Sequence, residues 1–264
     1  MLIKLLKHEI KATGRIFLSI YALLVIFSVI TKFVNRNMRV DSLFTGILVI
    51  LPTILYACII AGVCVMTLVL LIQRFSKNLL GAEGYLMHTL PVRPWQHIVC
   101  KLVVSSFWTI CSVILVSFSA LYMAVDVGGW RSFLETFRGI LASAGATFRL
   151  SGNAFFWGFA TILIVYIVEK TLMVYAGLAI GQLSSKQKVG ASVGAIVGMN
   201  IVEQLLGVAV LAILGNWGKL VNMNGTNAEI IRFIFWWIIC SAAAFGAIYA
   251  VISNLMLKRR LNLA

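Results

Sequence analysis

The 264-residue sequence is 61% hydrophobic and 11% charged, and its mean hydropathy is +1.02. Soluble domains contain about 45–50% apolar residues, so this composition excludes a water-soluble globular protein. The net charge of +14 would suggest nucleic-acid binding in a soluble chain, but here the Lys and Arg residues lie mostly between apolar runs. Anionic lipid head groups are the nearer partner there, so we expect contact with membrane lipid and no nucleic acid.

The first segment, residues 2–15, has the pattern of an amphipathic helix. Apolar residues occupy one face at helical spacing, and the opposite face carries Lys4, Lys7, Lys11 and Arg15. A helix of this kind lies along a membrane surface. No small-residue cleavage site follows the first apolar run, so we interpret that run as a retained helix and not as a signal peptide.

Six apolar runs follow, at residues 16–34, 44–72, 102–124, 154–180, 189–214 and 230–255. A helix needs about 20 apolar residues to cross a bilayer, and each run is long enough. We therefore predict an all-α integral membrane protein with six transmembrane helices in one domain, residues 1–264. Pro52 lies inside the second run and predicts a kink or a broken entry there.

Basic residues set the orientation of these spans. With the N-terminus inside, thirteen Lys and Arg residues flank the spans on the cytoplasmic side and eight on the outer side. We therefore place both termini in the cytoplasm. The outer segment 126–152 has an apolar helical face, and we expect a second interfacial helix there.

The five cysteines fall inside or beside the apolar runs, with no C-x-x-C pair and no clustering with His. We interpret them as small core residues, neither disulfides nor metal ligands. The three histidines are too scattered for a metal site, so no metal site is predicted.

The cytoplasmic loop between spans two and three, residues 74–101, is too apolar for a plain connector. Its centre predicts a short apolar helix over Gly84–Leu90, set off by Gly81 and stopped by Pro91. Pro94 suits the first turn of the helix that leads into span three. Such a helix either docks against a cytoplasmic partner or rests on lipid.

Span five opens with a row of small residues at four-residue intervals, Gly190, Gly194 and Gly198. Small rows let helix backbones approach closely in lipid. This row is predicted to pack either within the subunit or across a dimer.

Charged residues inside spans are functional candidates, and here they are Glu169, Lys170 and Glu203. From a rise of about 1.5 Å per residue, Glu169 and Lys170 lie about 22 Å from the outer end of span four, and Glu203 about 20 Å from the inner end of span five. These depths predict no direct pair between Lys170 and Glu203. Glu169 and Lys170 either snorkel to the cytoplasmic interface or act in the mechanism.

Glu203 lies deeper in its span and has two interpretations of its own. It is either a protonated or hydrogen-bonded acid tied to Asn200, to Gln204 or to a neighbouring helix, or a polar contact on a transport path or at a subunit interface.

The loop resembles that of the type-2 permeases of the ATP-binding cassette (ABC) transporters. Their loop carries an acid, a Gly, a short hydrophobic helix, a Thr-Pro stop and a Lys at the start of the next span. The matching residues here are Glu83, Gly84, Tyr85, Leu86, Thr89, Pro91 and Lys101. The match departs by one residue, because Leu90 separates Thr89 from Pro91.

The resemblance implies that the loop is a coupling helix inserted into a separate ATPase subunit. The coupling residues would be Glu83, Gly84, Tyr85, Leu86, Met87, Thr89, Leu90 and Pro91, and residues 2–15 would form a connecting helix nearby. Two ATPases and two permease subunits, as a homo- or heterodimer, would form the working unit in a bacterial cytoplasmic membrane. ATP and Mg²⁺ would bind to the partner ATPase, because no G-x-x-x-x-G-K-[ST] loop is present in this chain.

The leading functional hypothesis is therefore a permease subunit, not an enzyme, that exports an amphiphilic or peptide-like compound such as a drug, an antimicrobial peptide or a lipid-linked molecule. A bacteriocin or lantibiotic self-immunity permease of the same family is an alternative. A second class is an ion-coupled secondary transporter that uses Glu169 or Glu203, although no inverted repeat supports it. An intramembrane enzyme would need a convergent catalytic set that the spacing does not offer.

Overall fold

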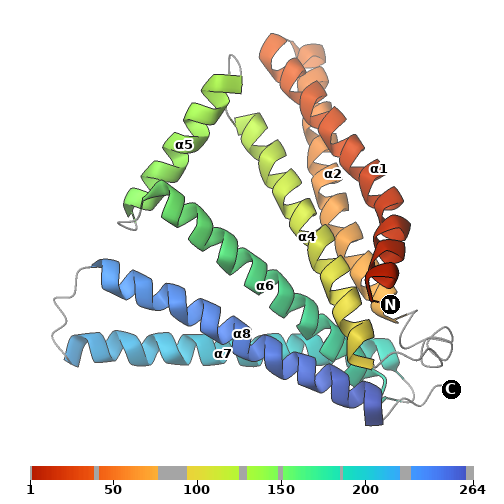
Figure 1. Cartoon of the computed structure of the whole chain (residues 1–264). Coiled ribbons are helices and arrows are strands. Elements are labelled where there is room, and N and C mark those ends of the chain that lie inside the picture. The colour runs from red at the N-terminus through yellow and green to blue at the C-terminus, as the bar shows by residue number, and fades with distance from the viewer. Residues whose placement is uncertain are drawn as a thin grey trace. The chain divides into compact units, whose positions relative to one another are not determined.

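The computed structural model describes residues 2–38, 42–76, 94–124, 130–147, 151–184, 187–220 and 227–259. These residues form seven helices and no strand (Figure 1), which confirms the all-α prediction. The helices are α1 (Leu2–Asn37), α2 (Leu43–Phe75), α4 (Pro94–Ala124), α5 (Trp130–Thr147), α6 (Gly152–Gly181), α7 (Lys188–Leu220) and α8 (Asn227–Arg259).

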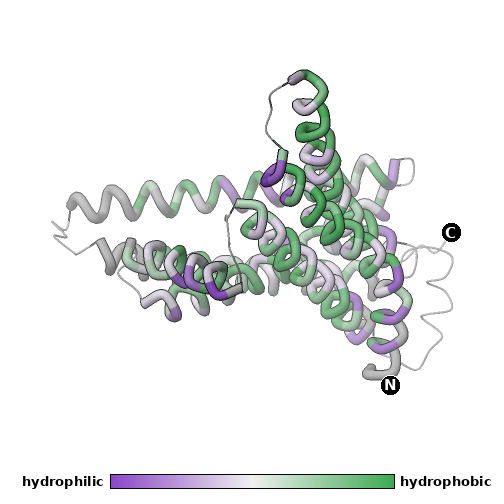
Figure 2. The backbone as a smooth tube through the Cα atoms, turned by 90° about the horizontal axis from the view of Figure 1, so that it is seen from above, coloured by the Kyte–Doolittle hydropathy of each residue, from purple (hydrophilic) through white to green (hydrophobic). Residues whose placement is uncertain are grey.

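Six helices in the described part of the chain are long and apolar enough to cross a membrane, as the sequence predicted. The candidate spans are Glu9–Asn37, Leu43–Gln73, Ile98–Ala124, Gly152–Gly181, Lys188–Val210 and Ile234–Met256. Figure 2 shows apolar residues along these helices, interrupted by few hydrophilic positions. The chain is therefore a multi-pass membrane protein.

Two local predictions differ from the observed helices. Residues 2–15 are helical, but α1 continues through Arg15 into the first span without a break. Of the two alternatives predicted at Pro52, a kink or a broken entry, the broken entry is wrong, because helix α2 continues through Pro52. The carbonyl of Pro52 accepts a hydrogen bond from Thr31 Oγ1 at 3.1 Å, which ties α1 to α2 beside the proline.

The chain divides into two compact units, and the first comprises Met1–Leu71 and Val103–Ile140. Its core joins α1, α2 and α4 through Phe17, Leu70, Val104 and Trp108. The Phe17 ring stacks on Trp108 with ring centroids 4.6 Å apart, and Trp108 Nε1 donates to Thr13 Oγ1 at 2.8 Å. Such bonds matter in lipid, where helix association lacks a hydrophobic driving force.

Helix α5 matches the segment predicted as an outer interfacial helix. Within the first unit, its Phe133 is buried, and the ring lies 5.2 Å from the Phe118 ring of α4. The location of α5 on the outer membrane surface stays a prediction.

The second unit comprises Ile72–Leu102 and Leu141–Ala264. Helix α6 is its centre, because it packs against both α7 and α8, and its buried residues extend from Ile167 to Gly181. The core cluster here is Leu172, Met173, Ala176 and Tyr249, with Leu102 of α4 packed against it. The end of α2 also belongs to this unit, because the fully buried Phe75 stacks on the fully buried Tyr175 of α6 with ring centroids 4.1 Å apart.

Candidate functional site

Two glycines of α6 fix how α6 and α7 lie against each other. A Cβ atom on Gly177 would lie 2.3 Å from Ile196 Cγ1, and one on Gly181 would lie 2.7 Å from the backbone nitrogen of Ser192. Only glycine allows backbones to come this close. Four residues separate the two contacts on each helix, so α6 and α7 form an antiparallel pair in one register.

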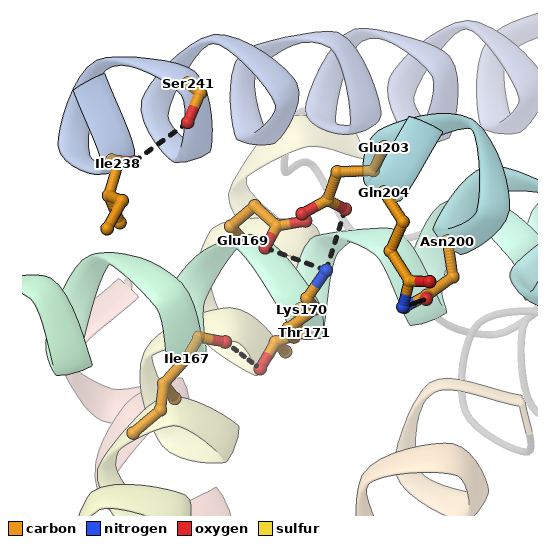
Figure 3. A network of polar contacts seen from close by, with 9 residues as sticks. All are labelled: Ile167, Glu169, Lys170, Thr171, Asn200, Glu203, Gln204, Ile238 and Ser241. Atoms are coloured by element: carbon orange, nitrogen blue, oxygen red, sulfur yellow. Dashed lines mark hydrogen bonds and ion pairs between the residues drawn. The ribbon is translucent and has the colours of Figure 1, made fainter. Parts of the chain in front are cut away.

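This register brings charged residues of the two helices together. Two helical turns, or seven residues, lead from Gly177 back to Lys170 on α6 and from Ile196 on to Glu203 on α7. Lys170 Nζ donates to Glu203 Oε2 at 2.7 Å. The same ammonium lies 3.4 Å from Glu169 Oε2, and Figure 3 shows the three side chains converging between the helices.

The prediction of no direct pair between Lys170 and Glu203 is therefore wrong. The depth of Glu203 was counted from the start of α7, but the end of α6 at Gly181 lies beside Ser192, four residues inside α7. Four residues correspond to about 6 Å along a helix, so the count overstated the difference in depth by that amount. Lys170 lies eleven residues from Gly181, and Glu203 lies eleven residues from Ser192, so the two residues are at the same level along the helix pair.

Glu169 is the most buried member of this charged cluster. Its side chain is 1% exposed, against 22% for Lys170 and 20% for Glu203. Helix α8 lies over it at Gly246, where a Cβ would be in ordinary contact, 3.8 Å from Glu169 Cα and Cβ. Within the described part of the chain, neither carboxylate oxygen of Glu169 has a hydrogen-bond partner. Burial of such an oxygen without a donor is costly.

One interpretation of the sequence tied Glu203 to Asn200, to Gln204 or to a neighbouring helix. The structure shows the last of these, because the partner of Glu203 is Lys170 of α6. Gln204 Nε2 donates to Asn200 Oδ1 at 2.8 Å, one turn along the same helix (Figure 3). The amide pair thus lies beside the charged cluster and not inside it.

The small-residue row of α7 lies mostly apart from the packing described above. A Cβ on Gly194 or Gly198 would meet no atom within 4 Å, and one on Gly190 would meet only the Gln187 side chain, at 3.6 Å. The close helix approach within unit two uses Gly177 and Gly181, which the sequence analysis did not single out. Their four-residue spacing inside span four was the signal that could have identified them.

The predicted coupling residues Glu83, Gly84, Tyr85, Leu86, Met87, Thr89, Leu90 and Pro91 lie outside the described residues. The sequence also predicted that Pro94 lies in the first turn of the helix that leads into span three. This is confirmed, because α4 begins at Pro94. Of the proposed connecting-helix residues, Lys4 lies in α1, and Lys7, Lys11 and Arg15 are exposed on it.

The charged cluster consists of hard oxygen donors and one ammonium. Where the structure describes the chain, no three His, Cys, Asp or Glu residues come together as a metal site, and the five cysteines are free thiols. Carboxylates of this kind can hold a proton, an alkali cation or a cationic group. The cluster therefore suits binding of positive charge.

No protein-family model, curated protein or solved structure matches this chain.

Proposed function

We propose that this chain is the membrane-spanning subunit of an ATP-driven transporter of the ABC type-2 permease class, energised by a separate ATPase. The observation that carries the proposal is the residue pattern from Glu83 to Lys101. Its residues from Glu83 to Pro91 lie between the candidate membrane spans of α2 and α4, and Lys101 lies within the second of these spans, Ile98–Ala124. A coupling element at that place would transmit a movement of the ATPase directly to the spans of α2 and α4.

Packing on both sides of the loop supports this role. Phe75, at the start of the loop, stacks on Tyr175 of α6. Leu102 follows the loop and packs against the cluster around Leu172. Both ends of the loop are thus attached to α6, the helix that carries Glu169 and Lys170. We infer that a movement of the loop is transmitted to α6 as well as to α2 and α4.

The finer parts of the proposal follow from the resemblance. Two copies of the ATPase bind ATP and Mg²⁺, a second permease subunit completes the path, and residues 2–15 act as the connecting helix. Both termini face the cytoplasm of a bacterial cell, and the cargo is an amphiphilic or peptide-like compound that is exported. A self-immunity permease would use the same parts for a bacteriocin.

One observation favours a second class, an ion-coupled secondary transporter. Glu169 is buried inside a span with no hydrogen-bond donor among the described residues, and intramembrane acids of this kind often lie on ion pathways. This alternative predicts transport driven by a proton or sodium gradient in the absence of any ATPase.

Co-purification with the products of adjacent genes separates the two classes. We expect recovery of an ATPase with the unmodified chain and its loss with Glu83→Arg or Leu86→Asp. Glu135→Arg is the matched control, because Glu135 is an exposed acid on α5. Expression levels must be equal in all variants. Gradient-driven uptake by the chain alone would contradict the proposal.

A further inference from the structure

The charged cluster has an unbalanced charge. Two glutamates and one lysine carry a net charge of −1 when all three are ionised, and Lys170 gives its hydrogen bond to Glu203. Glu169 Oε2 lies 3.4 Å from Lys170 Nζ, and no described residue donates a hydrogen bond to Glu169.

The surroundings make this imbalance costly. Glu169 lies twelve residues from the end of α6 at Gly181, which is about 18 Å along the helix and well inside a hydrocarbon core of about 30 Å. Its side chain is 1% exposed, so water does not screen it. An ionised acid in such a place needs a positive partner.

The geometry offers a place for that partner. Figure 3 shows the carboxylates of Glu169 on α6 and Glu203 on α7 pointing toward each other, with the Lys170 ammonium on one side. Two facing carboxylates supply only acceptor oxygens, so they hold together when one positive charge lies between them.

The other groups around the pair do not provide this charge. Tyr166 on α6 lies with its ring centre 5.2 Å from Lys170 Nζ. Tyr249 on α8 packs in the cluster with Leu172 and Met173. Neither side chain is cationic, and no His, Cys or second Lys in the described residues joins the group.

We propose that Glu169 and Glu203 together bind one monovalent cation in addition to Lys170, either a proton or an alkali cation such as Na⁺. A proton taken from water would convert Glu169 to a carboxyl group whose O–H donates to Glu203. An alkali cation would be held by the oxygens of both carboxylates. In both cases the cluster becomes neutral. This site requires no ATPase partner, so it stands independently of the function proposed above.

The test uses the full chain purified in detergent micelles, and its reference is Glu169→Gln. In this variant the cluster is already neutral, because Lys170 and Glu203 balance each other. Glu135→Gln is the matched control, since Glu135 is exposed on α5, outside the spans. Thermal unfolding is followed first against pH in choline chloride, and then against NaCl replacing choline chloride at constant pH and ionic strength.

A proton site makes the stability of the unmodified chain, relative to Glu169→Gln, fall as pH rises. The folding equilibrium constant changes by up to about tenfold per pH unit, because the folded state binds a proton that the unfolded state releases. It also gives an infrared carbonyl band of a protonated carboxyl at pH 7, where exposed carboxyls are ionised. A Na⁺ site gives no such band. Instead, NaCl stabilises the chain: above half-saturation of the site, each tenfold rise in NaCl concentration raises the folding equilibrium constant by up to about tenfold.

The stability of Glu135→Gln should change with pH and with NaCl in the same way as that of the unmodified chain. If Glu169→Gln does not fold, the infrared band and the NaCl series on the unmodified chain still decide. No carboxyl band at pH 7 together with no difference between NaCl and choline chloride would overturn the proposal.

Discussion

Adding one methyl group at Gly181 should separate α6 from α7. A Cβ atom there would lie 1.8 Å from Ser192 Oγ and 2.7 Å from both the Cβ and the backbone nitrogen of Ser192. The hydroxyl can rotate away, but the backbone nitrogen cannot. To reach an ordinary contact of 3.4 Å, the helices must move apart by roughly 0.7 Å, and overpacking of this kind costs about 1–3 kcal/mol.

Gly62→Ala is the matched control for Gly181→Ala. Gly62 also lies inside a candidate span, and a Cβ there would meet no atom within 4 Å. Gly62 lies inside α2 and Gly181 is the last residue of α6, so Gly62→Ala gains up to about 1 kcal/mol more helix propensity, and the rest of the difference between the variants reports the clash. We expect Gly181→Ala to be less stable than Gly62→Ala by about 1–3 kcal/mol, measured by reversible unfolding in mixed micelles and followed by circular dichroism.

Second-site changes sharpen this test. A Cβ on Gly177 clashes mainly with the Ile196 side chain, with Cγ1 at 2.3 Å, so Ile196→Ala should relieve Gly177→Ala with a favourable coupling of about 0.5–3 kcal/mol. Ser192→Ala should not relieve Gly181→Ala, because the backbone contact remains. Equal stabilities for Gly181→Ala and Gly62→Ala would refute the proposed register.

Three other substitutions test the packing around the candidate site. Lys170→Met should cost about 3–5 kcal/mol, because it leaves Glu203 without its buried partner; the double substitution with Glu203→Gln should recover part of this loss in the same unfolding assay. Phe75→Ala should cost about 3–5 kcal/mol by emptying a fully buried position against Tyr175, and limited proteolysis should then cut the adjacent loop faster. Trp108→Phe should cost about 1 kcal/mol, because the indole donates one buried hydrogen bond that Phe cannot make. An unchanged unfolding midpoint in any of the three would contradict the contact concerned.

Hydrophobic run length was enough to predict the six spans, because each run reaches the length of about 17–25 apolar residues that a bilayer requires, whatever its neighbours are. The start of α4 was also predictable, since Pro94 has a strong preference for the first turn of a helix. These features depend on local sequence alone.

The pair between Lys170 and Glu203 was not predictable in the same way. Its existence depends on a four-residue stagger of α7 against α6, which arises where Gly181 lets the Ser192 backbone approach. A count of depth along single helices contains no information about that stagger. The glycine row of α7 drew attention because it is longer, although Gly177 and Gly181 make the close contacts.

Phe75 illustrates a second limit. In the sequence it is one aromatic residue between Arg74 and Ser76, just beyond the apolar run 44–72, and nothing local predicts its partner. Its importance comes from Tyr175, which is 100 positions away in the chain and stacks on it. Long-range pairs of this kind become visible only when the helices are packed.

The proposed function requires the loop between α2 and α4 to be cytoplasmic and to dock on an ATPase, and cysteine labelling tests both requirements. A cysteine is placed at position 88 by His88→Cys in a chain whose five native cysteines are replaced, and the cysteine-free parent is the control. We predict that a membrane-impermeant thiol reagent reacts only from the cytoplasmic side, and that the co-expressed ATPase protects the site. Reaction from the outside, or unchanged labelling in the presence of the bound ATPase, would contradict the account.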